Sequence, residues 1–169
     1  SRLPCHHFTI RAILSIIEND QLRHLRISST IYSTREEFMD LTPLTAALAR
    51  TTTLETLKLS SNRLGRESTM AGLSSALAHN TSIKELELLN NHITPEGIEI
   101  FCSRLHEMKT LRKLDFRLNP ISEAGADILL AAVETNYVLR QIKIDRSFKQ
   151  YKQIVFYADL NSVGRQQLQ

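Results

Sequence analysis

The chain has 169 residues, of which 42% are hydrophobic and 23% charged, and its formal net charge is +3. This length and composition fit one folded domain, residues 1–169, and exclude a disordered chain. Basic and acidic residues are interspersed along the sequence, which argues against a dedicated nucleic-acid-binding face. We find no apolar run long enough to span a membrane and no signal-like segment, so no membrane contact is expected.

The N-terminal part, residues 1–21, is predicted to be the helical half of an incomplete repeat that caps the domain. Its segment 9–18 favours a helix. Ala12 and Ile16 are expected to face the core, because they precede the first strand by the same offsets as core residues in later repeats.

A short sequence phrase recurs along the chain and determines the predicted fold. It has leucine-type residues at positions 1, 4 and 6 and asparagine at position 9, as in Leu54-x-x-Leu57-x-Leu59-x-x-Asn62. Full or partial copies begin at Leu22, Leu54, Ile83, Leu111 and Leu139. A period of about 28 residues with this phrase is typical of stacked strand–helix units. The predicted full repeats are residues 22–53, 54–82, 83–110 and 111–138.

The second half of each repeat is predicted to be helical. Thr42 before Pro43, Thr94 before Pro95, and Ser122 are expected to be N-caps. In each of three helices, residues four apart are expected to form one buried stripe. The stripes are Thr69, Leu73 and Leu77; Gly97, Phe101 and Leu105; and Gly125, Leu129 and Val133.

Three further local features are predicted from the same patterns. The segment 34–37, Thr-Arg-Glu-Glu, resembles a capping box for a short extra helical turn in the first repeat. Asn80 is expected to end the second helix in the left-handed conformation that asparagine tolerates. Residues 139–169 are predicted to hold the last strand and a cap helix at 148–160, because an exposed solenoid end needs cover.

Residues of a strand point alternately to its two faces, which divides the repeat phrase into two sets. The apolar residues at positions 4 and 6 are expected in the core, whereas positions 3, 5 and 7 face the other side. Asn62, Asn91 and Asn119 are expected to satisfy buried main-chain groups where the chain turns away from each strand.

The phrase, followed by an aliphatic residue and a glycine as in Ile93/Gly97 and Ile121/Gly125, resembles the ribonuclease-inhibitor-like subfamily of leucine-rich repeat proteins. The resemblance covers roughly residues 8–146. It implies an α/β leucine-rich repeat solenoid, or horseshoe, with a parallel β-sheet on the concave face and α-helices on the convex face. The repeats are also similar to those of NOD-like receptors, Ran GTPase-activating proteins and tropomodulins, whose activities differ.

The function predicted for this solenoid is that of a non-enzymatic protein–protein interaction module. It would bind a protein or peptide through the concave strand face and adjoining loops. The predicted partner-binding residues are His24, Arg26, Lys58, Glu85, Glu87, Leu89, Lys113, Asp115, Arg117, Lys143 and Asp145. A regulatory module, either GTPase-activating or actin-capping, is the alternative; for GTPase activation, Arg63 and Arg117 are the suggestive residues. We expect a monomer.

Two interpretations of the charged strand residues stay open. Neighbouring strands are expected to pair Lys58 with Glu87, Glu85 with Lys113, Asp115 with Lys143, and Arg117 with Asp145. Such pairs can simply keep the sheet soluble, or they can form a recognition surface. Two apolar residues, Leu89 and Leu118, favour recognition slightly, because interfaces tend to have apolar centres with polar rims.

The sequence offers little for catalysis or metal binding. No nucleophile–base spacing, phosphate loop or paired-carboxylate motif is present, so no catalytic residue and no cofactor is predicted. The segment Cys5-His6-His7 has metal-ligand types, but adjacent residues rarely converge on one ion, and no metal is expected. Two distant cysteines suit a reducing compartment, which predicts a cytoplasmic location with the nucleus as an alternative.

Overall fold

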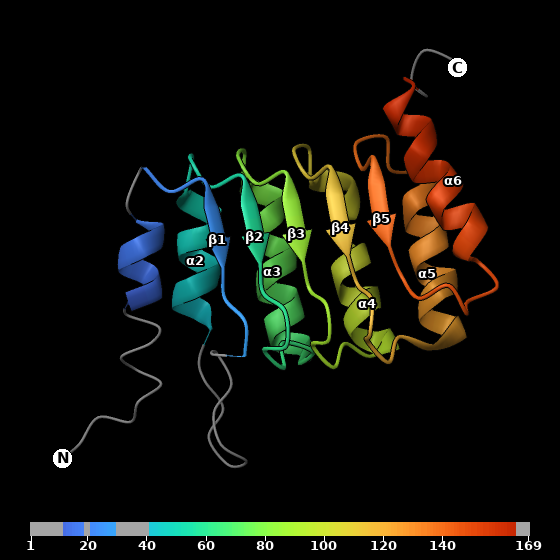
Figure 1. Cartoon of the computed structure of the whole chain (residues 1–169), viewed down its shortest axis with the longest axis horizontal. Helices are drawn as coiled ribbons and strands as arrows, with labels where there is room; N and C mark the ends of the chain where they lie inside the picture. Colours follow the sequence, from blue (N-terminus) through green and yellow to red (C-terminus); the bar gives the residue numbers. More distant parts are fainter. Residues whose placement is uncertain (1–11, 19–20, 30–40, 165–169) are drawn as a thin grey trace.

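The computed structural model describes residues 12–18, 21–29 and 41–164. The Cys5-His6-His7 segment and the capping box predicted at 34–37 lie outside these residues. Within the described ranges, five short strands form one parallel sheet in chain order, β1-β2-β3-β4-β5 (Figure 1). The strands are β1 His24–Arg26, β2 Thr56–Lys58, β3 Glu85–Glu87, β4 Lys113–Asp115 and β5 Gln141–Lys143. Each strand occupies positions 3 to 5 of a predicted phrase.

A layer of helices covers one face of the sheet and leaves the other face open (Figure 1). Residues 12–17 are helical, and they precede β1. The later helices are α2 Thr42–Arg50, α3 Glu67–His79, α4 Pro95–Cys102, the short 3-10 helix η1 Leu105–Glu107, α5 Ser122–Glu134 and α6 Tyr151–Ser162. Consecutive α-helices from α2 to α6 pack against one another. No helix in the described part of the chain is long and apolar enough to cross a bilayer. The fold is an α/β leucine-rich repeat solenoid.

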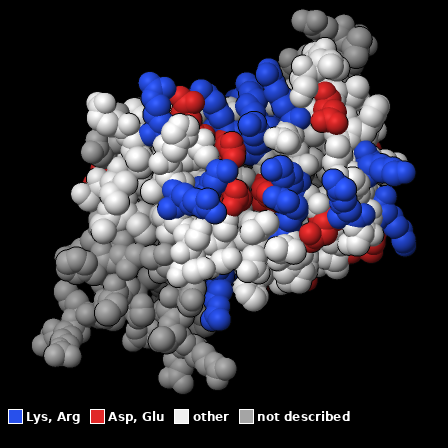
Figure 2. Space-filling view, in the orientation of Figure 1, with Lys and Arg blue, Asp and Glu red and all other residues white. Residues whose placement is uncertain are grey.

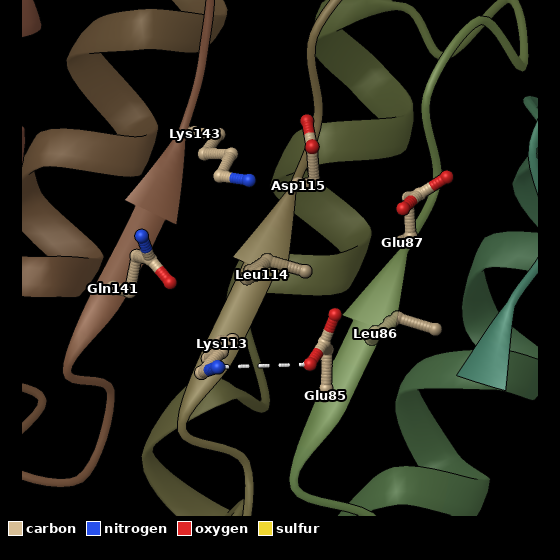
Figure 3. Close-up of a pocket in the computed structure, with 8 residues that line it drawn as sticks. All are labelled: Glu85, Leu86, Glu87, Lys113, Leu114, Asp115, Gln141 and Lys143. Carbon is tan, nitrogen blue, oxygen red and sulfur yellow. Dashed lines mark ion pairs between the residues drawn. The ribbon is translucent and has the colours of Figure 1, made fainter. Parts of the chain in front are cut away.

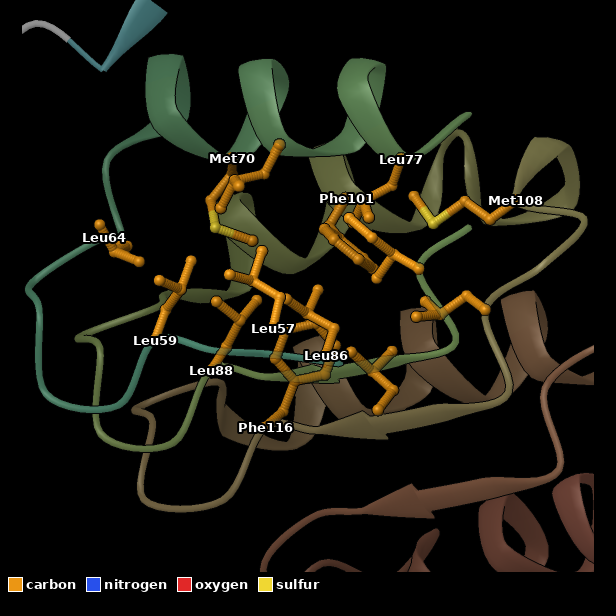
Figure 4. Close-up of a cluster of buried hydrophobic side chains, with 14 of the residues drawn as sticks. Leu57, Leu59, Leu64, Met70, Leu77, Leu86, Leu88, Phe101, Met108 and Phe116 are labelled. Carbon is orange, nitrogen blue, oxygen red and sulfur yellow. The ribbon is translucent and has the colours of Figure 1, made fainter. Parts of the chain in front are cut away.

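The core lies between the sheet and the helices, because equivalent residues of successive repeats stack in register. Leu57 pairs with Leu86, and Leu86 with Leu114, so position 4 forms one apolar row across the sheet. Position 6 forms a second buried row. From the helix side, Phe101 meets Phe116 edge to face with 5.3 Å between ring centroids (Figure 4). The predicted helix stripes are buried, with Leu105 on η1 rather than on α4.

Of the three predicted N-caps, only Thr94 caps a helix. Its hydroxyl accepts a hydrogen bond from the Gly97 N–H at the start of α4. The predictions for Thr42 and Ser122 were wrong, because each is the first residue of its helix and the N-cap positions belong to Leu41 and Ile121. Ser122 has φ of 55°, which is not the extended backbone that an N-cap side chain requires.

The N-terminal helix turns a different side to the core than predicted. Ile13 and Ile17 are buried, whereas Ala12 is exposed and Ile16 is 45% exposed. The buried pair therefore precedes β1 by one residue fewer than the corresponding pairs of later repeats precede their strands. A one-residue shift rotates the buried stripe by about 100° around a helix, which explains why the offset rule failed here.

The phrase asparagines form a ladder along the turns that follow the strands, as predicted. Asn62, Asn91 and Asn119 are all buried. The Asn62 N–H donates to the Asn91 side-chain oxygen at 2.8 Å, and the Asn91 N–H donates to that of Asn119 at 2.8 Å. Each side-chain amide also donates to a carbonyl of the preceding repeat, as Asn91 does to Leu59 at 2.8 Å. The ladder therefore links neighbouring repeats through buried main-chain groups.

A second asparagine ladder lies at the opposite ends of the strands. The Asn80 side chain donates to the carbonyls of Leu48 and Thr51 and accepts the N–H groups of Ser82 and Ile83. Asn136 and Asn161 make related bonds in later units. The left-handed cap predicted for Asn80 was wrong: its φ is −73° and ψ 138°, because its side chain joins two repeats instead of closing one helix.

Candidate partner-binding face

The sheet face that the helices leave open is the concave face of the solenoid. The predicted residues lie on it or just beyond its strands. His24 and Arg26 are on β1, Lys58 on β2, Glu85 and Glu87 on β3, Lys113 and Asp115 on β4, and Lys143 on β5, while Leu89, Arg117 and Asp145 follow β3, β4 and β5. In Figure 2, acidic and basic side chains alternate across the middle of this face, and basic side chains gather along its upper edge.

An ion-pair network joins β2 to β3. The Lys58 Nζ lies 3.1 Å from Glu85 Oε1 and 3.4 Å from Glu87 Oε2. The hydrogen bond to Glu85 raises the pKa of Lys58, and Glu87 adds to this effect. The Ser60 hydroxyl donates a hydrogen bond to Glu87. The predicted pair between Lys58 and Glu87 is therefore present, together with a second pair to Glu85 that the sequence analysis did not foresee.

A shallow hollow crosses β3, β4 and β5 beside this network (Figure 3). Its lining side chains include Glu85, Glu87, Lys113, Asp115, Gln141 and Lys143. Lys113 Nζ lies 3.8 Å from Glu85 Oε2, which is the second predicted pair. Because the hollow is open and charged, it suits contact with a polar surface better than enclosure of a small apolar ligand.

The other two predicted pairs are wrong. Asp115 contacts Arg117 of its own chain segment, with 2.7 Å between Oδ2 and Nη2, instead of Lys143. The Arg117 main-chain N–H also donates to Asp115, at 3.1 Å, so two bonds close a local ring and leave Asp115 buried. Asp145 accepts the Leu118 main-chain N–H at 3.1 Å instead of pairing with Arg117. The bond with Asp115 raises the pKa of Arg117.

The turns after the strands share an unusual backbone conformation. At position 8 of the phrase, Ser29, Ser61, Asn90 and Leu118 have φ between 52° and 58°. Asparagine tolerates this conformation, but a leucine in the left-handed region is uncommon. Leu118 is also 62% exposed, whereas Leu89 is half-buried. The apolar residue that the face presents to solvent is therefore mainly Leu118.

A row of charges at the start of the strands was missed by the sequence analysis. Glu55 on this row contacts Arg23 at 3.1 Å and Lys84 at 2.9 Å, and these neighbours lower its pKa, with the hydrogen bond from Lys84 the largest cause. Arg112 and Arg140 continue the row beside β4 and β5. The repeat period could have revealed this row of charges, because its members all occupy position 2 of the phrase. They are Arg23, Glu55, Lys84, Arg112 and Arg140.

The part of the chain that the structure describes offers little for metal binding or catalysis. No group of three His, Cys, Asp or Glu side chains there is arranged to hold a metal ion. Cys102 is a buried free thiol, and burial raises its pKa to about 12, so it is not an activated nucleophile. The Arg117 guanidinium, one of the two residues suggested for GTPase activation, is held by Asp115.

Comparisons with known proteins agree with this architecture. A family model described as "Leucine Rich repeat" matches residues 51–70, 79–102 and 107–129. A structure of leiomodin-1, described as actin-binding site 2, superposes with a TM-score of 0.76 over 91% of this chain and 90% of its own, at 19% identity. The tropomodulin C-terminal domain of Caenorhabditis elegans superposes with a TM-score of 0.71 over 94% and 96%, at 16% identity. No curated protein matches by sequence.

Strand–turn–helix units that stack in chain order around two asparagine ladders define a repeat solenoid. This chain has the leucine-rich repeat fold, and its repeats match the leucine-rich repeat family model at residues 51–70, 79–102 and 107–129. At the low identities of the two solved structures, the superposition shows a shared fold.

Proposed function

We propose that this chain is a non-enzymatic module that binds a protein or peptide through its concave face and the adjoining turns. The observation that carries the proposal is the open, in-register sheet face (Figure 2). Core packing and the two asparagine ladders explain the fold of the solenoid. The side chains on the open face of the sheet are not needed for that explanation. Those side chains are held in place by one another, as Glu85 and Glu87 are by Lys58, and a preordered surface loses little entropy on binding.

The test is a concave-face variant with Glu87, Leu89 and Arg117 all changed to alanine. A matched control changes Glu99, Lys109 and Glu123, which are exposed outside the strands. Proteins retained from a lysate by the wild type are identified, and their affinities for the three chains are measured by calorimetry. A stable complex should bury about 800 Å² on each partner. Loss of affinity in the concave-face variant alone supports the proposal, and equal affinity of all three folded chains refutes it.

An actin-binding module is a second candidate. It is favoured by the superposition on leiomodin-1, which is described as an actin-binding site and matches nearly the whole chain. Actin co-sedimentation and filament-elongation assays separate this candidate from a module with another partner. If filament elongation is unchanged when the protein is in large excess over filament ends, the actin-binding candidate is excluded.

GTPase activation remains the alternative from the enzyme-regulating class. Arg63 lies exposed in the turn after β2, where a catalytic arginine would have to reach a bound GTPase. A panel of small GTPases assayed for GTP hydrolysis with and without the chain tests this. No acceleration by the wild type, or equal acceleration by Arg63→Ala, would exclude an arginine contribution from this turn.

The proposed setting is the cytoplasm, with the nucleus as the alternative, and the proposed state is a monomer without cofactor. The buried reduced thiol of Cys102 supports a reducing compartment. Light scattering on the purified chain measures its mass directly.

A further inference from the structure

The basic side chains of the concave face are not compensated evenly. Toward the N-terminal side, Lys58 contacts Glu85 and Glu87, and the pair Arg23 and Lys84 shares Glu55. These three cations therefore have a carboxylate within 4 Å, whereas Arg26 on β1 is exposed and has no ion pair among the described residues. A partner would have to displace existing ion pairs to use them.

Immediately before β5, on β5 and in the turn after it, the cations lack such partners. Arg140, Lys143 and Arg146 are exposed, and none of them has a carboxylate within ion-pair distance among the described residues. The two nearest aspartates are already engaged, Asp115 by Arg117 and Asp145 by the Leu118 N–H. In Figure 3 the Lys143 side chain extends across the hollow toward the β4 side with no ion pair drawn to it. The positive charges at this end of the face are therefore not neutralised by carboxylates of the described residues.

Leu118 lies in the turn after β4, and its N–H donates to Asp145, the residue before Arg146. It is 62% exposed and adopts φ of 58° in a turn where the preceding repeats have serine or asparagine. The bond from its N–H to Asp145 and the bond from the Asn90 N–H to the Arg117 carbonyl hold the turn in place. An apolar side chain kept exposed on a strained, fixed turn is a feature from which a binding role can be inferred.

We propose that Leu118, Arg140, Lys143 and Arg146, here called the β5 surface, bind an acidic peptide segment of a partner protein. An apolar side chain of that segment packs on Leu118, and its carboxylates meet the three cations. The proposal rests on the function proposed above and specifies its partner. Arg140 and Arg146 are at most about 20 Å apart along the chain, which an extended segment of about six residues spans.

A peptide fits this surface better than a nucleic acid does. A nucleic-acid backbone carries a charge at every nucleotide, and on the adjacent strands it would meet the carboxylates of Glu85, Glu87 and Asp115. A peptide can place its carboxylates at separate points and bring an apolar residue to Leu118. Charge complementarity with an apolar centre is the arrangement that protein interfaces use.

The probe is a fluorescein-labelled synthetic peptide of about ten residues, with Glu and Asp around one central Leu, long enough to cover β5 when extended. Three comparison probes are the same peptide with Ser for Leu, with Lys for each acid, and an oligodeoxythymidylate of similar length. Binding is measured by fluorescence anisotropy at low and high salt. The variants are the triple R140Q/K143Q/R146Q, the single L118N, and a control triple R50Q/K109Q/K152Q, which removes the same charge elsewhere on the surface.

We expect the triple variant of the β5 surface to weaken binding of the acidic Leu peptide about tenfold to a hundredfold. L118N should weaken it about threefold to tenfold without lowering the denaturation midpoint, because asparagine tolerates the left-handed turn. The control triple should bind nearly as the wild type does. High salt should weaken the interaction, because it screens exposed charges.

Three outcomes overturn the inference: equal binding by the β5-surface and control triples, preference for the Lys peptide, or preference for the oligonucleotide. Self-association that the β5-surface triple abolishes would also overturn it, because a second copy would then occupy the surface. If a partner is lost in the Glu87, Leu89 and Arg117 variant while no acidic peptide binds, the concave-face function stands and only this inference fails. If neither set of variants affects any binding, both fail.

Discussion

The side-chain oxygen of Asn91 accepts the main-chain N–H of Asn62 at 2.8 Å, and this bond couples two successive repeats. The same oxygen lies 3.4 Å from the Leu64 nitrogen, and the side-chain amide donates to the Leu59 carbonyl. One buried amide therefore satisfies three main-chain groups of the preceding repeat, and it also donates to the Leu89 carbonyl of its own repeat at 3.2 Å. Stability of the solenoid is shared between units because of such side chains.

Asn91→Ala should lower the free energy of unfolding by about 2 kcal/mol or more, because it leaves buried donors and acceptors without partners. The measurement is urea denaturation followed by circular dichroism. The matched control is Asn90→Ser, at the exposed neighbouring position where the preceding repeat has Ser61. Equal midpoints for both variants would contradict the structural role of the ladder.

Gly65→Ala should be strongly destabilising, although no sequence pattern marked this glycine. A Cβ at Gly65 would lie 2.0 Å from the His92 carbonyl oxygen, so the turns of two repeats would have to separate. We expect a loss of at least about 2 kcal/mol. Gly72→Ala is the control, because its Cβ would meet only the side chain of Thr45, at 3.1 Å. Thermal unfolding of the two variants should differ clearly, and similar melting temperatures would refute the predicted clash.

The N-terminal helix offers a test of which side is buried. Ile17→Ala should lower the free energy of unfolding by roughly 2–4 kcal/mol, because Ile17 is 3% exposed. Ile16→Ala should change it by no more than about 0.5 kcal/mol, because Ile16 is 45% exposed. Chemical denaturation of the two variants measures the difference. A larger effect at Ile16 would restore the stripe predicted from sequence offsets.

The thiol of Cys102 should make stability depend on alkaline pH. Its pKa is about 12 in the folded chain, above the ordinary thiol value of 9.0, because it is buried. The thiol stays protonated in the folded state while the unfolded state loses the proton, so stability is fully present below about pH 9 and falls as pH rises toward 12. The slope from this group approaches about 1.4 kcal/mol per pH unit.

Denaturation between neutral pH and about pH 10.5 measures this slope, and a Cys102→Ala chain supplies the baseline from other groups. In a Cys5→Ser background, the native Cys102 thiol should also react with a thiol reagent only as the chain opens. If the thiol reagent reacts fully with Cys102 at pH 8 without denaturant, Cys102 is accessible and this prediction is wrong.

Much of the fold follows from residues whose roles are local and repeated. Leu57 and Leu59 alternate along a strand, and Asn62 follows at the turn, so burial of all three can be predicted from spacing alone. The same spacing places Lys58 beside β3. It does not decide which carboxylate a flexible lysine chooses, and in the structure Lys58 contacts both Glu85 and Glu87.

The candidate site was predicted less completely, because side-chain partners depend on competition in space. Asp115 was expected to contact Lys143 but is held by Arg117, which lies closer and also donates its main-chain N–H. Arg140 and Arg146 were not among the predicted binding residues. Whether a basic side chain has a carboxylate nearby can be seen only once the positions of its neighbours in the folded chain are known. Leu118 had been noted as apolar, but its left-handed backbone became visible only in the folded turn.

The sequence by itself determined the repeat, the strand positions, the parallel order and the buried asparagines, because each depends on periodicity within one unit and is reinforced when the unit recurs. Only the tertiary structure decided the side of the first helix that meets the core, the second ladder through Asn80 and Asn136, and the uncompensated charge beside β5. Those features depend on distances between units, and small differences in connection length and competing partners change them without altering the repeat.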